Sequence, residues 1–329
     1  MEQMSQEALV LTMGDPAGIG IEIATKAWIA RKSEQISPFV LVGDASLIEF
    51  QVGKLFSDVA IEIVTSVKQG IECFEGSLPV MDPHQGQTDS EKTLAAIELA
   101  TNLCQIGAAT AMVTNPIQKK RLYDAGFSHP GHTEYLADLT GAPGKAIMMF
   151  ACPGLKVVPA TIHIPLEKVP ESISEEQLEY IIRTTIKDLK SRFGKEDPRI
   201  VVAGLNPHAG EEGSIGRQEL EIIGPLVERL SSEGLHVTGP YPSDSLFHAA
   251  ARQKYDAAIC MYHDQALIPI KTIDFDRGVN VTLGLPIIRT SPDHGTAEDI
   301  AGKGIANPAS LIAAINMANE MAIRLKETS

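Results

Sequence analysis

Apolar runs of strand length alternate along this chain with segments in which apolar residues recur at every third or fourth position. The runs at 8–13 and 39–43 are of the first kind, and the segments at 22–31 and 178–193 are of the second. Because parallel strands joined by helices give this alternation, the pattern predicts an α/β fold with a mostly parallel sheet. The same pattern predicts a strand over 109–114 and helices over 92–105, 217–232 and 309–326.

Three of the strand-like runs end in a histidine. They lead into His163, His208 and His263, and loop residues follow each of them. The carboxyl ends of parallel strands open onto the edge of the sheet where ligands bind, so we expect the three imidazoles at one edge. Three neutral imidazoles with an open fourth position suit a catalytic divalent metal. A single histidine after a strand is more often a hydrogen-bonded loop residue than a ligand, but three in the same position favour a ligand set more strongly, and the pattern alone leaves both interpretations open.

Length and charge narrow the class of protein. The 329 residues are 44% apolar, which suffices for about two domains around a sizeable core. Because no long polar linker interrupts the pattern, we expect two lobes that share one continuous or adjoining sheet. The formal net charge of −14 comes without a compensating block of Lys and Arg. We therefore expect neither a nucleic acid nor an anionic membrane as a partner.

The cysteines and the first residues bear on the compartment. Cys73, Cys104, Cys152 and Cys260 lie far apart and form no Cys-x-x-Cys pair, which argues against a disulfide framework or a thiolate zinc site. Residues 1–7 carry acids where a signal peptide needs positive charge. No apolar stretch approaches the ~20 residues of a membrane span. We therefore expect a cytoplasmic protein with reduced cysteines.

Two loops rich in small residues are candidates for nucleotide binding. The loop at 14–20 has glycines at 14, 18 and 20, so it lacks the Gly-x-Gly-x-x-Gly dinucleotide fingerprint. The stretch at 293–308 offers many backbone donors and leads into the last predicted helix. It also carries Asp299, an acid suited to a ribose diol. On its residues alone, this second loop is a plausible anion or nucleotide site.

The second loop also resembles a known segment. Residues 294–308 are similar to the His-Gly-Ser-Ala-Pro-Asp-Ile-Ala-Gly-Lys-Gly-Ile-Ala-Asn-Pro segment of the isocitrate and isopropylmalate dehydrogenase superfamily. Residues 14–22 likewise resemble its Gly-Asp-Gly-Ile-Gly-Pro-Glu segment, although Ile21 stands where proline is usual. Superfamily members bind the adenosine half of NAD at the segment that corresponds to residues 294–308. The resemblance therefore implies NAD as cofactor, with contacts from His294, Gly295, Thr296, Asp299 and Asn307.

Over its whole length the chain resembles the family of 4-hydroxythreonine-4-phosphate dehydrogenases, which belongs to this superfamily by fold. Six motifs in order carry the similarity, at 12–20, 129–134, 204–211, 239–244, 261–265 and 278–286. The resemblance implies a two-lobed α/β/α fold of the isocitrate/isopropylmalate dehydrogenase type, with the active site in the cleft between the lobes. We expect the first lobe over 1–140 plus 296–329. The second, over 141–295, should carry the metal ligands and dimer contacts.

The resemblance assigns the three strand-end histidines to a metal. It implies that His163, His208 and His263 hold one divalent ion per active site, and we expect Zn²⁺, with Co²⁺, Mg²⁺ or another divalent ion as alternatives. Lys271 and Asp244 are the predicted catalytic residues, as candidates to take the hydroxyl proton of the substrate, and a metal-bound hydroxide is the alternative base. Asp244 could orient a ligand histidine or make a fourth contact to the metal or substrate, and it is equally compatible with a turn residue or helix cap.

The resemblance also implies contacts to a small phosphorylated hydroxy acid from His132, Thr133, Lys271, Asn280 and Arg289. Arg and Lys suit phosphate and carboxylate groups, although a lone Arg or Lys is more often a solvated surface charge. Arg289 follows the apolar run at 283–288, which favours a strand end over an open face. His129 lies three residues before His132, but the intervening Pro130 argues against a helical pair of ligands, so we expect His129 to be structural.

The implied activity is metal-dependent, NAD-linked oxidation and decarboxylation of 4-phosphohydroxy-L-threonine to 3-amino-2-oxopropyl phosphate in pyridoxine 5'-phosphate (vitamin B6) biosynthesis. A paralogous dehydrogenase of D-threonate or D-erythronate 4-phosphate is one alternative, because its metal and phosphate sites would be nearly unchanged. A non-redox enzyme on the same scaffold, such as a phosphate acyltransferase or a class II aldolase-like lyase, is a more distant one. The resemblance further implies a homodimer with shared active sites, in which we expect His163 or His263 to cross the interface.

Overall fold

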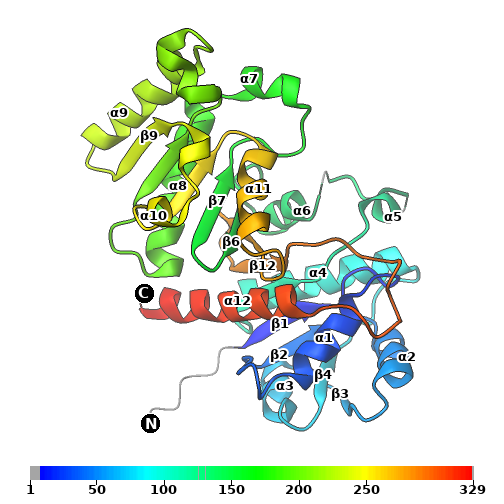
Figure 1. Cartoon of the computed structure of the whole chain (residues 1–329). Helices are drawn as coiled ribbons and strands as arrows, with labels where there is room; N and C mark the ends of the chain where they lie inside the picture. The colour runs from blue at the N-terminus through cyan, green and yellow to red at the C-terminus, as the bar shows by residue number, and fades with distance from the viewer. Residues whose placement is uncertain (1–7, 125, 130, 328–329) are drawn as a thin grey trace. The chain divides into compact units, whose positions relative to one another are not determined.

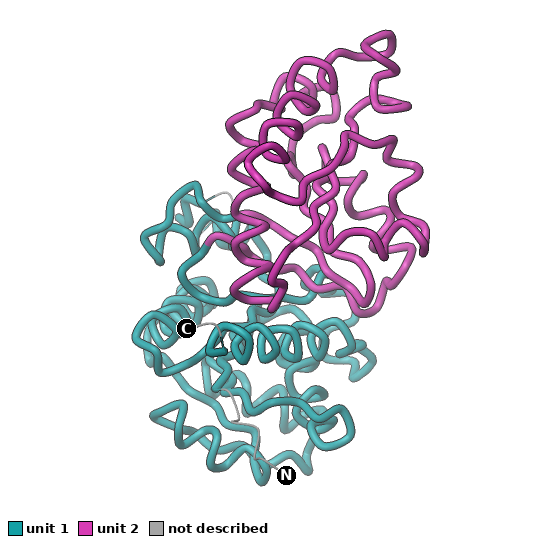
Figure 2. The backbone as a smooth tube through the Cα atoms, turned by 90° about the vertical axis from the view of Figure 1, so that its left-hand side faces the viewer, with its two compact units in different colours: residues 1–146, 285–327, 329 teal, residues 147–284, 328 magenta. Residues whose placement is uncertain are grey.

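The computed structural model describes residues 8–124, 126–129 and 131–327, and the chain separates into two compact units (Figure 2). Unit 1 combines the N-terminal part of the chain up to residue 146 with residues 285–327, and unit 2 consists of residues 147–284. The acidic segment 1–7, on which the expectation about a signal peptide rests, falls outside the described residues, as does Pro130 between His129 and His132.

Unit 1 contains a parallel sheet in which the strands follow the order β3-β4-β2-β1-β5-β12. Every residue of β1, β2, β4 and β5 is buried, which explains why these strands appear as continuous apolar runs in the sequence. The strands are β1 (Leu9–Thr12), β2 (Phe39–Val42), β3 (Ile61–Ile63), β4 (Leu78–Met81), β5 (Ala111–Thr114) and β12 (Arg289–Pro292).

Helices cover both faces of the unit 1 sheet. α4 packs against β1, β2 and β5, and α12 packs against β1, β5 and β12 from the opposite face (Figure 1). α4 begins with a capping box, in which Thr88 and Glu91 each accept a hydrogen bond from the other's backbone N–H. The helices are α1 (Gly20–Ile29), α2 (Ala45–Leu55), α3 (Val67–Cys73), α4 (Asp89–Gln105), α5 (Lys119–Asp124), α6 (His132–Leu139) and α12 (Ala309–Glu327).

Unit 2 contains a mixed sheet in the order β11-β6-β7-β10-β8-β9. β6 runs antiparallel to both β11 and β7, whereas β7, β10, β8 and β9 are parallel. β10 lies between β7 and β8, so the carboxyl ends of these three strands meet at one edge. The strands are β6 (Ile147–Cys152), β7 (Leu155–Pro159), β8 (Ile200–Ala203), β9 (Val237–Tyr241), β10 (Ala257–Cys260) and β11 (Val279–Leu283).

The helices of unit 2 include two long amphipathic ones, α8 and α11. α11 packs against β6, β7 and β10, and α8 packs against β11. α8 is capped at its carboxyl end by Gly194, whose φ of 63° is the left-handed conformation that glycine adopts at low cost. The elements are η1 (Leu166–Lys168), α7 (Val169–Ser172), α8 (Glu175–Phe193), η2 (Pro207–Gly213), η3 (Glu219–Ile223), α9 (Gly224–Ser232), η4 (Ser243–Ser245), α10 (Ala249–Arg252) and α11 (His263–Ile273).

The predicted α/β fold with mostly parallel strands is confirmed in both units. One predicted helix differs in detail, because the segment predicted as a helix over 217–232 consists of the π-helical turn η3 followed by α9. Pro225 lies in the first turn of α9 and has no N–H to donate to the preceding turn, so a regular α-helical ladder cannot run through this point.

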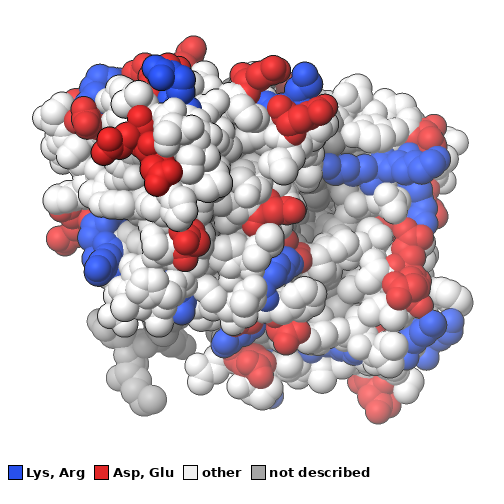
Figure 3. Space-filling model, turned by 45° about the horizontal axis from the view of Figure 1, so that its top comes forward, with Lys and Arg blue, Asp and Glu red and all other residues white. Residues whose placement is uncertain are grey.

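The surface charges and the helices can be compared with the two expectations about nucleic-acid and membrane partners. On the face shown in Figure 3, Lys and Arg side chains lie among Asp and Glu side chains and do not form one block. In the described part of the chain, no helix combines the length and the apolar character needed to cross a membrane.

Candidate functional site

The three histidines predicted as metal ligands follow three neighbouring strands of unit 2. His163 comes four residues after β7, His263 begins α11 after β10, and His208 lies in η2 after β8. Because β10 pairs in parallel with both β7 and β8, all three side chains start from the same edge of the sheet. The sequence predicted this common edge from the pattern of apolar runs alone.

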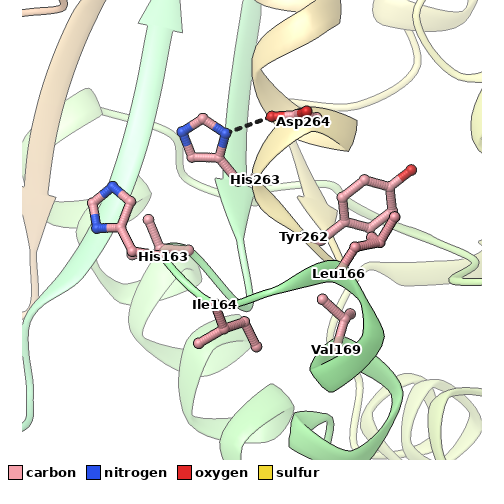
Figure 4. Close-up of a pocket in the computed structure, with 8 residues that line it drawn as sticks. His163, Ile164, Leu166, Val169, Tyr262, His263 and Asp264 are labelled. Carbon is pink, nitrogen blue, oxygen red and sulfur yellow. Dashed lines mark hydrogen bonds and ion pairs between the residues drawn. The ribbon is translucent and has the colours of Figure 1, made fainter.

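Two of these histidines lie side by side. The ring centroids of His163 and His263 are 5.9 Å apart, with the ring planes inclined by 41°. Nδ1 of His263 is 2.7 Å from Oδ1 of Asp264 (Figure 4). When the carboxylate accepts a hydrogen bond from Nδ1–H, the neutral ring carries its lone pair on Nε2, which is the form that binds a metal.

A cavity of about 290 Å³ opens beside this pair. Figure 4 shows the imidazoles on one side of it and the aliphatic side chains of Ile164, Leu166 and Val169 on the other. Leu166 is 67% exposed, so an apolar surface borders the histidine pair in the isolated chain. The cavity is large enough for a small molecule, because one water occupies about 30 Å³.

His208 does not join the pair. It opens a run of residues with left-handed backbone, from His208 to Glu212, in which the four non-glycine residues have φ between 45° and 56°. Such a conformation costs about 1–2 kcal/mol for each non-glycine residue. Within the described residues, no group of three or more His, Cys, Asp or Glu side chains is close enough together to hold a metal ion. The structure therefore brings His163 and His263 together and leaves His208 apart.

Glu219 holds the strained turn in place, and the sequence did not reveal it. Its carboxylate is buried and accepts hydrogen bonds from the backbone N–H of Asn206 at 2.7 Å and from the Asn206 side chain at 2.9 Å. A glutamate at the start of a predicted helix gives no sign of such a partner, because the partner lies in the preceding loop.

Gln265 is a second residue that sequence reasoning missed. Its side chain accepts a hydrogen bond from Met261 N at 2.6 Å and donates to the carbonyl of Gly204 at 2.8 Å and to the hydroxyl of Ser243 at 2.9 Å. It thus ties together the ends of β10 and β8 and the turn η4, which carries Asp244. The only sequence signal is its place in the motif at 261–265, which names no partner.

The predicted catalytic residues Asp244 and Lys271 occupy different parts of unit 2. Asp244 is exposed in η4, and Lys271 lies in the last turn of α11 with its ammonium 5.2 Å from the ring centroid of Phe275. Asn280, in β11, has a buried Oδ1 atom with no hydrogen-bond partner in the described structure. A buried amide oxygen in this state is available to a ligand donor.

In unit 1, buried Arg289 and half-buried His132 form a polar cluster in which the charge of Arg289 acts on the imidazole. Arg289 is the first residue of β12, only 4% exposed, and its Nε and Nη2 atoms donate to the hydroxyl of Thr114 at 3.1 and 2.7 Å. Burial lowers the pKa of Arg289 to about 10, so it remains charged at neutral pH. Burial and the nearby cations Arg289 and Lys119 hold the pKa of His132 well below its usual value.

These charges make the cluster suited to an anion. Nε2 of His132 is buried and has no hydrogen-bond partner in the described part of the chain, and Thr133 next to it is also buried. A neutral imidazole and a guanidinium together offer donors to a phosphate or carboxylate without a competing negative charge of their own. The structure places the predicted contacts His132, Thr133 and Arg289 in unit 1 and Lys271 and Asn280 in unit 2.

The predicted dinucleotide loop is anchored on α1. Glu22, which is 3% exposed, accepts hydrogen bonds from Gly304 N at 3.2 Å and Ala306 N at 2.8 Å. Lys26 donates to the carbonyl oxygens of the same two residues at 2.9 and 2.6 Å and pairs with Glu22 at 3.0 Å. Asp299 lies in the exposed part of the loop before these anchors.

The ends of this loop have local partners as well. Nδ1 of His294 is 2.9 Å from the carbonyl of Gly295, and Oδ1 of Asn307 accepts from Ala309 N at 3.0 Å at the start of α12. The carbonyl of Thr296 accepts from Ile19 N at 3.0 Å, which joins the loop to the segment before α1. The loop residues could be identified from the sequence, but the anchoring roles of Glu22 and Lys26 could not, because their partners lie some 280 positions away.

The opening loop at 14–20 is organised by Asn115, another residue that sequence reasoning missed. The fully buried Asn115 side chain donates to the carbonyls of Thr12 at 3.0 Å and Gly20 at 3.1 Å. Gly20 cannot carry a side chain, because a Cβ atom there would lie 2.2 Å from the carbonyl oxygen of Met13. The one available signal was the Asn-Pro dipeptide directly after β5.

Comparison with known proteins gives consistent matches. Residues 34–318 match a family model described as pyridoxal phosphate biosynthetic protein PdxA. The chain is 47% identical to a 4-hydroxythreonine-4-phosphate dehydrogenase of Bradyrhizobium diazoefficiens, over 98% of this chain and 99% of the relative. A crystal structure of that enzyme from Klebsiella pneumoniae has a TM-score of 0.84 at 36% identity, covering 96% and 99% of the two chains. An isocitrate dehydrogenase from Methylococcus capsulatus, at 18% identity and a TM-score of 0.50 over 97% and 86%, is similar in fold alone.

Proposed function

The chain belongs to the family of pyridoxal phosphate biosynthetic PdxA proteins, and from this premise we propose that it catalyses the metal-dependent, NAD-linked oxidation and decarboxylation of 4-phosphohydroxy-L-threonine to 3-amino-2-oxopropyl phosphate. It is an oxidoreductase of a family whose curated members are named 4-hydroxythreonine-4-phosphate dehydrogenase. The observation that supports a phosphorylated substrate is the pairing of buried Arg289 with neutral His132, because it combines a positive charge with a buried Nε2 atom of His132 that has no hydrogen-bond partner among the described residues.

The phosphate and carboxylate of the substrate are anions that this cluster would bind. Arg289 can bind a phosphate or carboxylate through two parallel N–H donors, and the pocket remains charged because the guanidinium is protonated at neutral pH. His132 and Thr133 add donors beside it. Lys271 and Asn280, which belong to unit 2, are the further substrate contacts that we propose.

His163, His208 and His263 are the residues that would hold the divalent ion, for which we propose Zn²⁺. Nitrogen donors at the ends of three neighbouring parallel strands fit such an ion, and two of the rings already lie side by side. When bound there, the ion would act as a Lewis acid toward the reacting oxygen of the substrate. Asp264 contributes by fixing the ring of His263 in the tautomer whose Nε2 can act as a ligand.

The reaction requires a base for one proton. Oxidation of the secondary alcohol would release its hydroxyl proton to a base, with NAD⁺ as the acceptor of the carbon-bound hydride, and the carbon that then loses carbon dioxide from the β-keto acid would take up a proton in return. We propose Lys271 or Asp244 as that base. Gln265 holds the turn of Asp244 against the ends of β8 and β10, so it positions one of the two candidates.

The cofactor proposal concerns the loop at 293–308. His294, Gly295, Thr296 and Asn307 lie in the stretch that would contact NAD, and Asp299 would accept hydrogen bonds from the ribose hydroxyls of its adenosine half. Its negative charge would repel the additional phosphate of NADP, so NAD should be preferred. The exposure of Asp299 supports this role, because its carboxylate is accessible to a ligand.

We propose a homodimer with shared active sites and a cytoplasmic location. The exposed Ile164 and Leu166 beside the histidine pair support a partner surface at this point, because burial of apolar area drives association. The four cysteines are free thiols, which suits a reducing compartment. A third imidazole must reach the pair, either from His208 after a change in the turn at 207–213 or across the dimer interface.

A substrate panel tests the proposed function. The protein is incubated with NAD⁺ and, separately, with 4-phosphohydroxy-L-threonine, D-threonate 4-phosphate and D-erythronate 4-phosphate while NADH is followed by absorbance. We expect kcat/KM to be much the highest for the amino acid phosphate. Turnover of a sugar acid phosphate without turnover of the amino acid phosphate would replace this proposal with the paralogous activity.

A further inference from the structure

Three segments of unit 1 that are distant in the sequence meet at the guanidinium of Arg121, in α5. Its Nη1 atom pairs with Asp15 of the opening loop, and its Nη2 atom pairs with Glu298 of the loop at 293–308, at 2.5 Å. One side chain thus bridges two loops that are 283 positions apart, from 15 to 298. Neither the site residues nor the mechanism described above makes use of this bridge.

Asp15 is the fixed end of the bridge. Its side chain is only 6% exposed and also accepts hydrogen bonds from Ala17 N at 2.9 Å and Gln118 N at 3.2 Å. A carboxylate with three donors has little freedom to move. Arg121 is therefore held on one side by a rigid anchor, and any ordering effect of the bridge falls on its other partner.

Glu298 is the movable end. It is exposed and lies directly before Asp299, the residue proposed to bind the ribose. The hydrogen bond from Arg121 lowers the pKa of Glu298, so the carboxylate keeps its charge at neutral pH. In the superfamily segment quoted above this position is proline, which has no carboxylate, so the resemblance does not imply the ion pair.

The backbone around Glu298 needs such a restraint. Ala297 has a φ of 46°, in the left-handed region that costs a non-glycine residue about 1–2 kcal/mol. Upstream, the carbonyl of Thr296 accepts from Ile19 N, and downstream the anchors on α1 begin only at Gly304. The exposed stretch between these points includes Asp299, and the Arg121–Glu298 pair is the ionic contact at its start.

We propose that Arg121 is a positioning residue for the dinucleotide, because it holds Glu298 against Asp15 and thereby fixes the backbone that presents Asp299. This role rests on the proposed NAD site. Arg121 touches neither the cofactor nor the substrate in this account, and it acts through the conformation of the loop.

The test compares Arg121→Met, Glu298→Gln and the double variant with the wild-type protein by titration calorimetry with NAD. We expect the Kd for NAD to rise about 5- to 30-fold in each single variant and no further in the double variant, because both substitutions remove the same contact. Arg121→Lys should recover part of the loss. Lys120→Met is the matched control, since it removes the adjacent exposed pair with Asp124 on the same helix.

Two further readouts separate positioning from a general structural role. The Kd for 4-phosphohydroxy-L-threonine and the kcat at saturating NAD should stay within twofold of wild type in Arg121→Met. Amide hydrogen exchange at residues 298–303, measured without NAD, should become faster in Arg121→Met and stay unchanged in Lys120→Met. A folded Arg121→Met protein with wild-type affinity for NAD would overturn the proposal.

The failure of the proposed function has a different signature. If the wild-type protein does not bind NAD, the proposal that NAD is its cofactor is wrong. The proposed role of Arg121 toward a dinucleotide is then wrong as well, even if hydrogen exchange still shows that Arg121 restrains the loop. Equal weakening of NAD and substrate binding together with a lower Tm would show that Arg121 stabilises unit 1 as a whole, and this outcome too would overturn the proposal.

Discussion

Arg289 carries a charge in the buried interior of unit 1. Its guanidinium is buried, and its hydrogen bonds to Thr114 go to a neutral hydroxyl. Removing an ion from water costs several kcal/mol unless other charges compensate. Here burial has the largest effect on the guanidinium, and Glu134 offsets it only in part. We interpret this as a site that keeps a cation ready for an anionic substrate at the expense of stability.

Replacing Arg289 with methionine should therefore separate activity from stability. We expect kcat/KM for 4-phosphohydroxy-L-threonine to fall about 10- to 150-fold, because a hydrogen bond to a charged group contributes about 1.5–3 kcal/mol. The Tm should stay unchanged or rise, since an apolar side chain of similar volume removes a buried charge. Arg324→Met, at an exposed position on α12, is the control and should alter neither quantity. A large loss of Tm with unchanged kcat/KM in Arg289→Met would contradict this interpretation.

At the residue scale, sequence could locate chemistry but not its partners. His163 and His263 were predicted at one sheet edge and lie side by side there. Arg289 was predicted to follow a strand formed by the apolar run at 283–288, but β11 ends at Leu283 and Arg289 instead begins β12. Glu22 and Gln265 were not found, because what each does depends on backbone groups that only the folded chain brings near them.

At the scale of elements, apolar periodicity placed most helices and strands but not their polar ends. The helix predicted over 92–105 begins at Asp89, since its first turn is stabilised by the Thr88–Glu91 capping box and carries no apolar residue of its own. The π-helical turn before α9 was missed for a similar reason. The spacing of apolar residues does not show that Pro225 has no N–H to donate to a carbonyl of the preceding turn.

An ion-pair network between α8 and α9 gives a prediction for this scale. Glu179 of α8 accepts hydrogen bonds from Arg229 and Arg183, and these bonds lower its pKa to about 2. Because the folded pKa is depressed, the network stabilises the fold fully above the unfolded value near 4.5 and loses this effect as the pH falls toward 2. Glu179→Gln should therefore lower the Tm at pH 7, and the difference from wild type should shrink between pH 4.5 and pH 2.

Thermal unfolding across this pH range measures the effect. Glu228→Gln, an exposed position on α9, serves as the control and should give a Tm close to wild type throughout. A deficit in Glu179→Gln that stays constant from pH 7 to pH 2 would show that the side chain contributes by packing and not by its charge.

For the whole molecule, the sequence indicated a discontinuous first lobe but could not locate its borders from composition. The prediction started the returning segment at residue 296, after β12, whereas unit 1 takes up the chain again at residue 285. β12 pairs with β5 of unit 1, and this pairing joins residues that are far apart in the sequence. Strand pairing of this kind leaves no local signal, because it depends on which edge is available after the earlier strands have formed.

Assembly gives the prediction that belongs to this scale. Alanine variants at His163, His208 and His263 are mixed pairwise, unfolded and refolded together, and their activity is measured. If one ligand is donated across a two-fold interface, the two mixtures that contain its variant should recover to about a quarter of wild-type activity, since half of the random pairs rebuild one of two sites. The third mixture should stay inactive. Absence of recovery in all three mixtures, with heterodimers demonstrated, would exclude a shared site.

The central claim is that the three strand-end histidines hold the ion on which the reaction depends, and elemental analysis tests it most directly. His163→Ala, His208→Ala and His263→Ala should each lose bound divalent metal and activity together, while circular dichroism shows an intact fold. His236→Ala, an exposed histidine of unit 2 paired with Asp197, should keep both. A full complement of metal in all three variants would contradict the account, whatever their activity.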